Sequence, residues 1–140
     1  MSTTQKTEPD SNQIYFKQLL SGRDFAADDQ LAQQMVNFVY LIGDKSTREC
    51  MIVDPAYAVE ELLSVAEQDG MKVVGALATH YHPDHVGGSM MGANIDGIAT
   101  LLSKVDIPIH VQELEAQWVM RTTGVSANHL HQHHYMPLRL

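Results

Sequence analysis

Six consecutive residues in the middle of the chain carry four side chains that can bind a metal ion. They lie in the run Thr79-His80-Tyr81-His82-Pro83-Asp84-His85-Val86-Gly87-Gly88 and are His80, His82, Asp84 and His85. Imidazole and carboxylate ligands together suit zinc, with iron and manganese as alternatives. A single histidine is ordinarily a surface or core residue, but four such ligands at this spacing predict a hydrolytic metal site.

The spacing also predicts how these ligands divide between two ions. His80 and His82 are two residues apart, and on an extended segment such side chains point the same way, so both can reach one ion. Pro83 favours entry into a helix, whose first turn would place Asp84 and His85 beside that pair. Two adjacent metals can share a hydroxide and polarise a carbonyl or phosphoryl oxygen. Asp84 is the predicted catalytic group, because it can orient that water while binding metal.

The motif follows a predicted strand, helix and strand. We expect strands over residues 14–20, 35–42, 50–53 and 71–78, of which the second and third form a hairpin. Asp54 and Pro55 predict a helix start, and apolar residues at helical spacing continue to Gly70. The motif begins where the strand over 71–78 ends, and sites in α/β proteins lie outside such carboxyl ends of strands.

The rest of the chain has a simpler pattern. We expect a flexible tail over residues 1–12, one partial domain over 13–140 and a charged loop over 21–30. Downstream of the motif, the spacing predicts a helix over 98–105, a strand over 107–111 and a helix over 112–123. Residues 128–137 have no clear periodicity.

Composition narrows the classes of function. Apolar residues make up 44% of the 140 residues, enough for a core, and the net charge of -8 argues against a nucleic-acid partner. No apolar stretch reaches the roughly 18 residues that span a membrane, and residues 1–12 have no apolar signal core. The single cysteine, Cys50, excludes an internal disulfide and is predicted to be a small buried hydrophobe. A cytoplasmic location follows as the expectation.

The motif T-H-x-H-x-D-H-x-G-G, with the preceding run Met51-Ile52-Val53-Asp54-Pro55, resembles the metallo-β-lactamase superfamily over about residues 14–120. This resemblance implies an α/β fold, the αββα sandwich, of which the chain would form the amino-terminal half. It also implies that His80 and His82 bind the first metal, and Asp84 and His85 the second. Residues 109–116 look like the glyoxalase II type of member.

The chain departs from the family pattern after the motif. Members supply a third histidine from a G-H-T-P-G-type segment, then a bridging aspartate and a final histidine, and none of these is present. The late histidines lack the glycine-rich context, so we expect a solvated loop that binds metal only adventitiously, and His110 is expected to be structural. Asp54 either orients a ligating histidine or caps the following helix. The late histidines are His129, His131, His133 and His134.

The resemblance implies a metal-dependent hydrolase, with two Zn2+ ions in the complete domain, that acts on a small molecule. The expected substrate is a thioester, lactone or related ester. A mononuclear iron persulfide dioxygenase of the same fold is one alternative, and a catalytically incomplete fragment that binds metal weakly is another. The acidic charge disfavours the nucleases of the superfamily.

Overall fold

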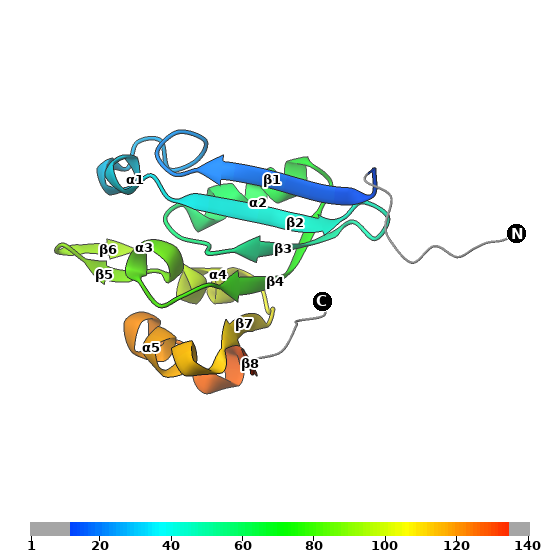
Figure 1. Ribbon diagram of the computed structural model, residues 1–140. Helices are drawn as coiled ribbons and strands as arrows, with labels where there is room; N and C mark the ends of the chain where they lie inside the picture. Colours follow the sequence, from blue (N-terminus) through cyan, green and yellow to red (C-terminus); the bar gives the residue numbers. More distant parts are fainter. Residues whose placement is uncertain (1–11, 135–140) are drawn as a thin grey trace, which may run out of the picture.

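A six-stranded mixed sheet organises the computed structural model, which describes residues 12–134 (Figure 1). In spatial order its strands are β1 (Ile14–Leu20), β2 (Phe38–Asp44), β3 (Glu49–Val53), β4 (Lys72–Ala78), β7 (Ile109–Gln112) and β8 (Leu130–His133). The first three strands pair antiparallel, and β3, β4, β7 and β8 pair parallel. A separate hairpin joins β5 (Gly88–Met90) to β6 (Ala93–Ile95).

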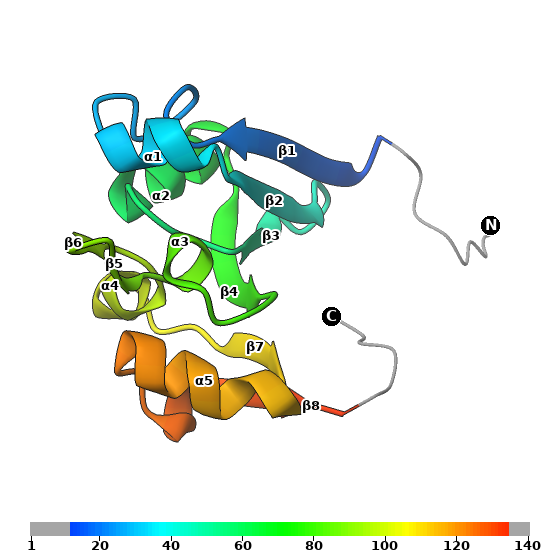
Figure 2. The same ribbon diagram turned by 60° about the vertical axis from the view of Figure 1, so that its left-hand side comes forward.

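Helices connect the parallel strands. α2 (Val59–Gln68) joins β3 to β4, α4 (Ile98–Lys104) precedes β7, and α5 (Glu113–Thr123) joins β7 to β8. In Figure 1, α2 and α4 lie behind the sheet, and Figure 2 shows α5 running alongside β7 and β8. Three short helices complete the chain, namely α1 (Gln30–Met35), α3 (Pro83–Val86) and the 3-10 helix η1 (Ala127–His129).

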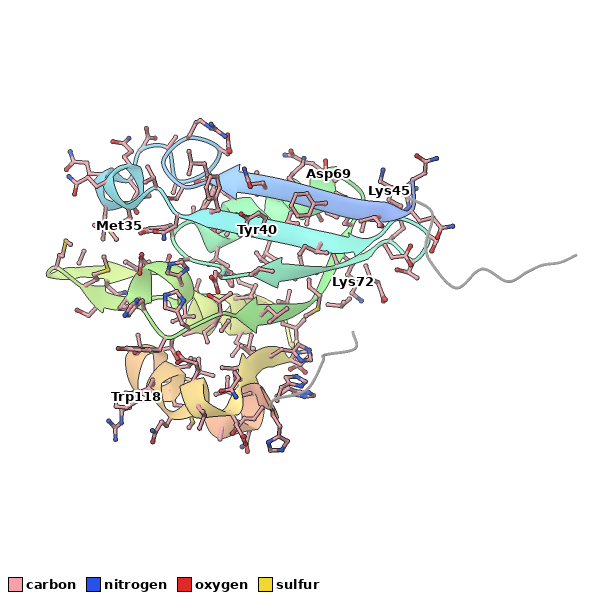
Figure 3. The ribbon with its side chains drawn as sticks, in the orientation of Figure 1. Met35, Tyr40, Lys45, Asp69, Lys72 and Trp118 are labelled. Carbon is pink, nitrogen blue, oxygen red and sulfur yellow. The ribbon has the colours of Figure 1, made fainter. Side chains whose placement is uncertain are left out.

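The two faces of the sheet differ in burial. On β2, Val39 and Leu41 are fully buried toward the helices, whereas Phe38 and Ile42 on the opposite face are exposed. Tyr40, labelled in Figure 3, also belongs to that opposite face. The described residues therefore form one large sheet with its helices and a small β5–β6 hairpin, which is a partial domain of the expected fold.

The strands predicted over 14–20 and 50–53 correspond to β1 and β3, whereas the strand predicted over 35–42 is displaced toward the C-terminus. The strand predicted over 35–42 begins only at Phe38, because Met35 ends α1 and Val36 has a left-handed backbone, with φ of 47°. The predicted loop over 21–30 also misses the start of α1, where the Asp29 side chain accepts hydrogen bonds from the backbone N–H groups of Leu31 and Ala32.

The prediction that Asp54 caps α2 is wrong. That helix begins at Val59 with Ala58 as its N-cap, and Pro55 precedes it in the connecting segment. Asp54 has a φ of 55° and is 6% exposed. Its carboxylate points instead to the end of β4, so of the two roles predicted for it the orienting role agrees with the structure.

Most downstream predictions are confirmed. The helix over 98–105 is α4, the strand over 107–111 overlaps β7, and the helix over 112–123 is α5, ended by Gly124 with φ of 77°. Cys50 is 1% exposed, and burial raises its pKa to about 11, as expected of a structural thiol. The segment after residue 127 was not predicted to be regular, but it adds β8 to the sheet.

Parts of two predictions lie outside the described residues. The tail over 1–12 is described only at Asn12, and the partial domain over 13–140 is described to His134. Between residues 12 and 134, no helix has both the length and the apolar character that crossing a bilayer requires.

Candidate metal centre

The motif turns sharply where β4 ends. β4 ends at Ala78, and after Thr79 to Tyr81 the chain reaches His82, the extended N-cap of α3, with Pro83 in the first turn. The predicted helix entry at Pro83 is thereby confirmed. Asp84 lies in this single helical turn and is only 9% exposed.

Glycines after α3 let the motif pack against its neighbours. Gly87 has a φ of 92°, and a Cβ added there would lie 2.7 Å from the Cα of Gly97. A Cβ on Gly88 would lie 2.7 Å from the carbonyl oxygen of Thr122 in α5. Both positions therefore need glycine, because a side chain at either one would clash with the backbone of a neighbouring segment.

Asp54 holds the motif to the end of β3. Its Oδ1 accepts a hydrogen bond from the backbone N–H of Thr79 at 2.8 Å, and its Oδ2 accepts one from the Thr79 hydroxyl at 2.6 Å. The same Oδ2 lies 2.9 Å from Nδ1 of His85. The carboxylate thus fixes the orientation of the His85 ring and directs its Nε2 away from Asp54.

Asp84 and His85 come together on the other side of that ring. Asp84 Oδ2 lies 3.6 Å from His85 Nε2. Two ligands of one tetrahedral ion, each about 2.0–2.2 Å from it, lie roughly 3.3 Å apart. The separation of these two atoms therefore suits a shared divalent cation.

His80 and His82 lie beside this pair. Their ring centroids are 4.8 Å apart, and the ring of His80 is 4.2 Å from that of His85. Nδ1 of His80 lies 2.9 Å from the Thr79 hydroxyl, which leaves Nε2 of His80 available to bind a metal ion. The three imidazoles are therefore adjacent, although within residues 12–134 His82 does not belong to the group whose ligand atoms all lie within 4.8 Å of one another.

The pKa values of two motif histidines shift in opposite directions. The hydrogen bond that His85 donates to Asp54 raises the pKa of His85, because the carboxylate stabilises the imidazolium. Burial, followed by the charge of His85, lowers the pKa of His80. A metal ligand must be a neutral imidazole, so the low pKa of His80 favours metal binding at neutral pH.

The tightest group of donor atoms includes a residue outside the motif. Ligand atoms of Asp54, His80 and His85 all lie within 4.8 Å of one another. Asp54 already uses both carboxylate oxygens on Thr79 and His85, so its contacts are those of an orienting group. The imidazole nitrogens and carboxylate oxygens gathered here fit a borderline divalent metal ion, such as zinc.

Asn37 is a site residue that the sequence did not reveal. Its Nδ2 donates to Asp84 Oδ2 at 3.1 Å and lies 3.1 Å from His85 Nε2, while its Oδ1 accepts from the Tyr57 hydroxyl at 3.2 Å. Asn37 directly precedes β2, about fifty residues before the motif, and no local pattern marks it. Only the sheet topology brings it to this edge.

An aromatic wall borders the motif on the side of α5. We give this name to Tyr81 and Trp118, whose ring centroids are 5.8 Å apart and which are 36% and 40% exposed. Trp118 is labelled on α5 in Figure 3, and the Arg121 guanidinium lies 4.9 Å from its ring. The backbone N–H of Tyr81 donates to Glu115 Oε1 at 3.0 Å, which ties the motif to α5.

The late histidines are not part of the motif. His131 and His133 lie on β8 and contact His110 on β7. Between residues 12 and 134, no hydrogen bond, ion pair or ring contact joins them to His80, His82 or His85. The loop predicted for this segment is thus wrong for His131 and His133.

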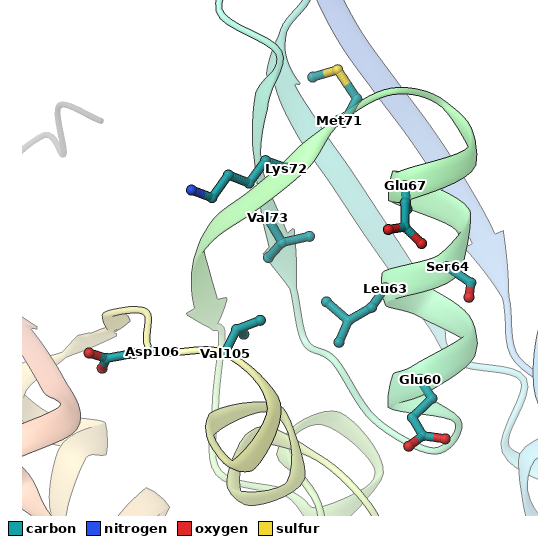
Figure 4. A pocket seen from close by; sticks show the side chains of 9 residues that line it. All are labelled: Glu60, Leu63, Ser64, Glu67, Met71, Lys72, Val73, Val105 and Asp106. Carbon is teal, nitrogen blue, oxygen red and sulfur yellow. The ribbon is translucent and has the colours of Figure 1, made fainter.

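A groove of about 580 Å³ lies away from the motif. Figure 4 shows Leu63 and Glu67 of α2 on one side of it and Val105 on the other, with Met71 and Lys72 near the start of β4. Because the motif follows the opposite end of β4, this groove is not part of the metal centre.

Comparison with known proteins gives one family. The model of the metallo-beta-lactamase superfamily matches residues 33–135. A hydroxyacylglutathione hydrolase from Rhodospirillum rubrum is 38% identical over 60 residues, which are 43% of this chain and 23% of that protein. The match to the metallo-beta-lactamase superfamily confirms the family that the motif predicts.

Solved structures agree on the fold. A metallo-beta-lactamase from Staphylococcus aureus superposes with a TM-score of 0.52 at 28% identity, over 74% of this chain and 25% of that one. BLEG-1, a B3 metallo-beta-lactamase, gives a TM-score of 0.54 at 21% identity, over 79% of this chain and 47% of that one. The predicted α/β fold of this type is confirmed. The chain spans only 20% to 32% of the length of the curated relatives that it matches.

Proposed function

The chain belongs to the metallo-beta-lactamase superfamily, and from that premise we propose that it carries half of the active site of a metal-dependent thioester or ester hydrolase. His80 and His82 would hold one divalent metal ion, and Asp84 and His85 a second. The observation that supports this most directly is the approach of Asp84 Oδ2 to within 3.6 Å of His85 Nε2, on a ring whose other nitrogen Asp54 holds.

Zinc is the proposed metal, since mixed imidazole and carboxylate ligands suit it. When bound, the metal supplies Lewis acidity toward a carbonyl oxygen and lowers the pKa of a coordinated water toward 7. Asp84 would receive a hydrogen bond from the attacking water and hold it in line with the carbonyl carbon. Asp54 keeps His85 in one orientation through the contact at 2.9 Å.

The substrate proposal follows from the relatives and from the wall beside the motif. Several matched proteins are named hydroxyacylglutathione hydrolases, so we propose a hydroxyacyl thioester of glutathione as the first substrate to test. Tyr81 and Trp118 offer flat apolar surface to the acyl chain or thiol carrier. The guanidinium of Arg121, which lies over the ring of Trp118, is a cation that could pair with a substrate carboxylate.

The test is hydrolysis of a lactoyl thioester of glutathione by the full-length protein, loaded with zinc. We expect release of free thiol, and we expect His82→Ala to abolish it. The matched control is His129→Gln, which removes an exposed histidine of η1 and should leave turnover unchanged.

Three results would contradict this proposal. Full activity in His82→Ala would remove the motif from the reaction. Hydrolysis of a lactone or simple ester without thioester turnover would overturn the substrate class but keep the hydrolase. One iron per chain with uptake of oxygen would favour the persulfide dioxygenase of the same fold.

A further inference from the structure

A second group of imidazoles lies on β7 and β8. We call His110, His131 and His133 the edge histidine cluster. His110 pairs in register with His131, and His133 follows His131 by two residues on the same strand. Paired residues, and residues two apart on a strand, project from the same face of a sheet. The three imidazoles therefore share one face, while Ile109, Val111 and Leu130 are buried toward the other.

The three rings are also in contact. Nδ1 of His110 lies 2.8 Å from Nε2 of His133, with ring centroids 5.1 Å apart. The ring of His131 lies 5.3 Å from that of His110 at an interplanar angle of 65°. The three residues do not bring ligand nitrogens within 4.8 Å of one another, so the His131 ring has to turn to complete the site. In the hydrogen bond between His110 and His133, the lone pair of one nitrogen accepts the N–H of the other, so both nitrogens can face a metal ion only after the donor ring moves its proton to its other nitrogen. Widening the distance between these two nitrogens from 2.8 Å to roughly 3.3 Å gives the separation of two nitrogen ligands on one tetrahedral ion.

The surroundings favour a neutral His110 ring, which metal binding requires. Burial lowers the pKa of His110, and the nearby His133 and His131 lower it further. No acidic side chain contacts the cluster within residues 12–134, and the nearby Glu113 pairs instead with His134 at 2.7 Å. A site of nitrogen ligands alone selects borderline ions such as zinc, nickel or copper over magnesium or calcium.

We propose that the edge histidine cluster is a second metal site, separate from the motif, that binds one divalent transition-metal ion through His110, His131 and His133. β8 is the outer strand of the sheet, and its only strand partner in the described chain is β7. An ion held by both strands would fasten this edge to the sheet. Three protein ligands leave the fourth position of a tetrahedral ion to water.

The test counts zinc bound by the chain after equilibrium dialysis, with elemental analysis as the readout. We expect the double variant His131→Gln, His133→Gln to bind one zinc fewer than the wild type. The matched control, His129→Gln with His134→Gln, removes the same number of histidines from the same segment and should bind as the wild type does. His110→Gln should also lose one zinc, because its ligand comes from β7.

The motif can be removed from this test. In a background with His80→Gln, His82→Gln and His85→Gln, the edge site should still bind one zinc, so its failure and the failure of the proposed hydrolase are distinguishable. Equal loss of zinc in the cluster and control variants would mean adventitious binding by a histidine-rich segment and would overturn the proposal. Wild-type binding by His110→Gln would overturn it as well.

A direct measurement covers the case in which a variant fails to fold. Long-range proton–nitrogen NMR spectra of the wild-type chain report each imidazole separately. Added Zn2+ should shift the ring nitrogens of His110, His131 and His133 together and leave those of His129 in place. Shifts confined to the motif histidines would contradict the proposal.

Discussion

The motif and the edge histidine cluster use the same side chain in two different environments. His85 contacts the carboxylate of Asp54, which raises its pKa, whereas the His110 ring contacts the imidazoles of His131 and His133, and burial lowers its pKa. The motif combines nitrogen and oxygen ligands within one turn of chain. The cluster offers nitrogen alone, from two strands. Between these two rings, the hydrogen bond to a carboxylate raises the pKa of His85, whereas burial without such a partner lowers the pKa of His110.

The largest expected effect comes from removing the motif's own ligands. Replacing His80, His82 and His85 by Gln removes a ligand from each proposed motif ion and should abolish zinc binding at the motif. The edge cluster should keep its ion, because no contact joins the two groups in the described chain. Elemental analysis of dialysed protein, combined with the imidazole NMR spectrum, measures both sites. Loss of zinc from both would show that they form one coupled site and would break the comparison.

The motif was predictable from sequence because its chemistry is local. His80, His82, Asp84 and His85 occupy six consecutive residues, so a strand end and one helical turn suffice to bring them together. Asp54 was recognised only as one of two alternatives, since Asp-Pro is equally typical of a helix start. The structure separates the two, because α2 begins four residues after Pro55.

The edge cluster was not predictable in the same way. His110 and His133 are 23 residues apart, and their contact depends on the parallel pairing of β7 with β8. Polar, histidine-rich β8 lacks the β-branched and aromatic residues that mark a strand in sequence. Asn37 was not predictable for the same physical reason, because the order of the strands in the sheet brings it into contact with Asp84 and His85.

Asp54→Asn gives the next largest effect, and it sharpens the comparison by removing the carboxylate from His85. An amide keeps one acceptor oxygen but places an N–H₂ group against either Thr79 or His85. We expect zinc affinity at the motif to fall by about 10- to 100-fold, the usual cost of losing a partner that orients a metal ligand. Isothermal titration with Zn2+ measures this change.

The control for Asp54→Asn is zinc binding at the edge cluster, which should stay at the wild-type affinity. The same substitution should also lower the pKa of His85 toward that of an ordinary histidine, which NMR titration of the metal-free protein can follow. An unchanged affinity and an unchanged titration would mean that Asp54 acts only on the backbone of Thr79.

The pH dependence of stability gives a smaller effect at the cluster. The pKa of His110 is lower in the folded state, so between about pH 6.5 and that lower value the unfolded chain binds a proton that the folded chain does not. The free energy of unfolding of the metal-free protein should therefore fall as the pH falls through this range. His110→Gln should reduce the slope, by at most one proton per chain, in urea unfolding measured in EDTA from pH 7.5 to 5.

Replacing His131 and His133 by Gln tests the origin of that slope. It removes the like charges that face His110 but leaves the burial beside Val111, and burial is the larger cause of the lowered pKa. We expect this double variant to keep most of the wild-type slope. A slope as shallow as that of His110→Gln would mean that repulsion among the imidazoles, rather than burial, controls the titration.

The smallest effect concerns the link between the motif and α5. Glu115 accepts a hydrogen bond from the backbone N–H of Tyr81, in an exposed position between two metal ligands in sequence. Glu115→Ala should cost about 1 kcal/mol, the net value of one hydrogen bond, seen as a small decrease in the free energy of unfolding. Glu115→Gln keeps an acceptor oxygen and should retain most of that stability. If Glu115→Ala instead weakened zinc binding as much as Asp54→Asn does, α5 would be positioning the ligands, and the motif would depend on long-range packing as the cluster does.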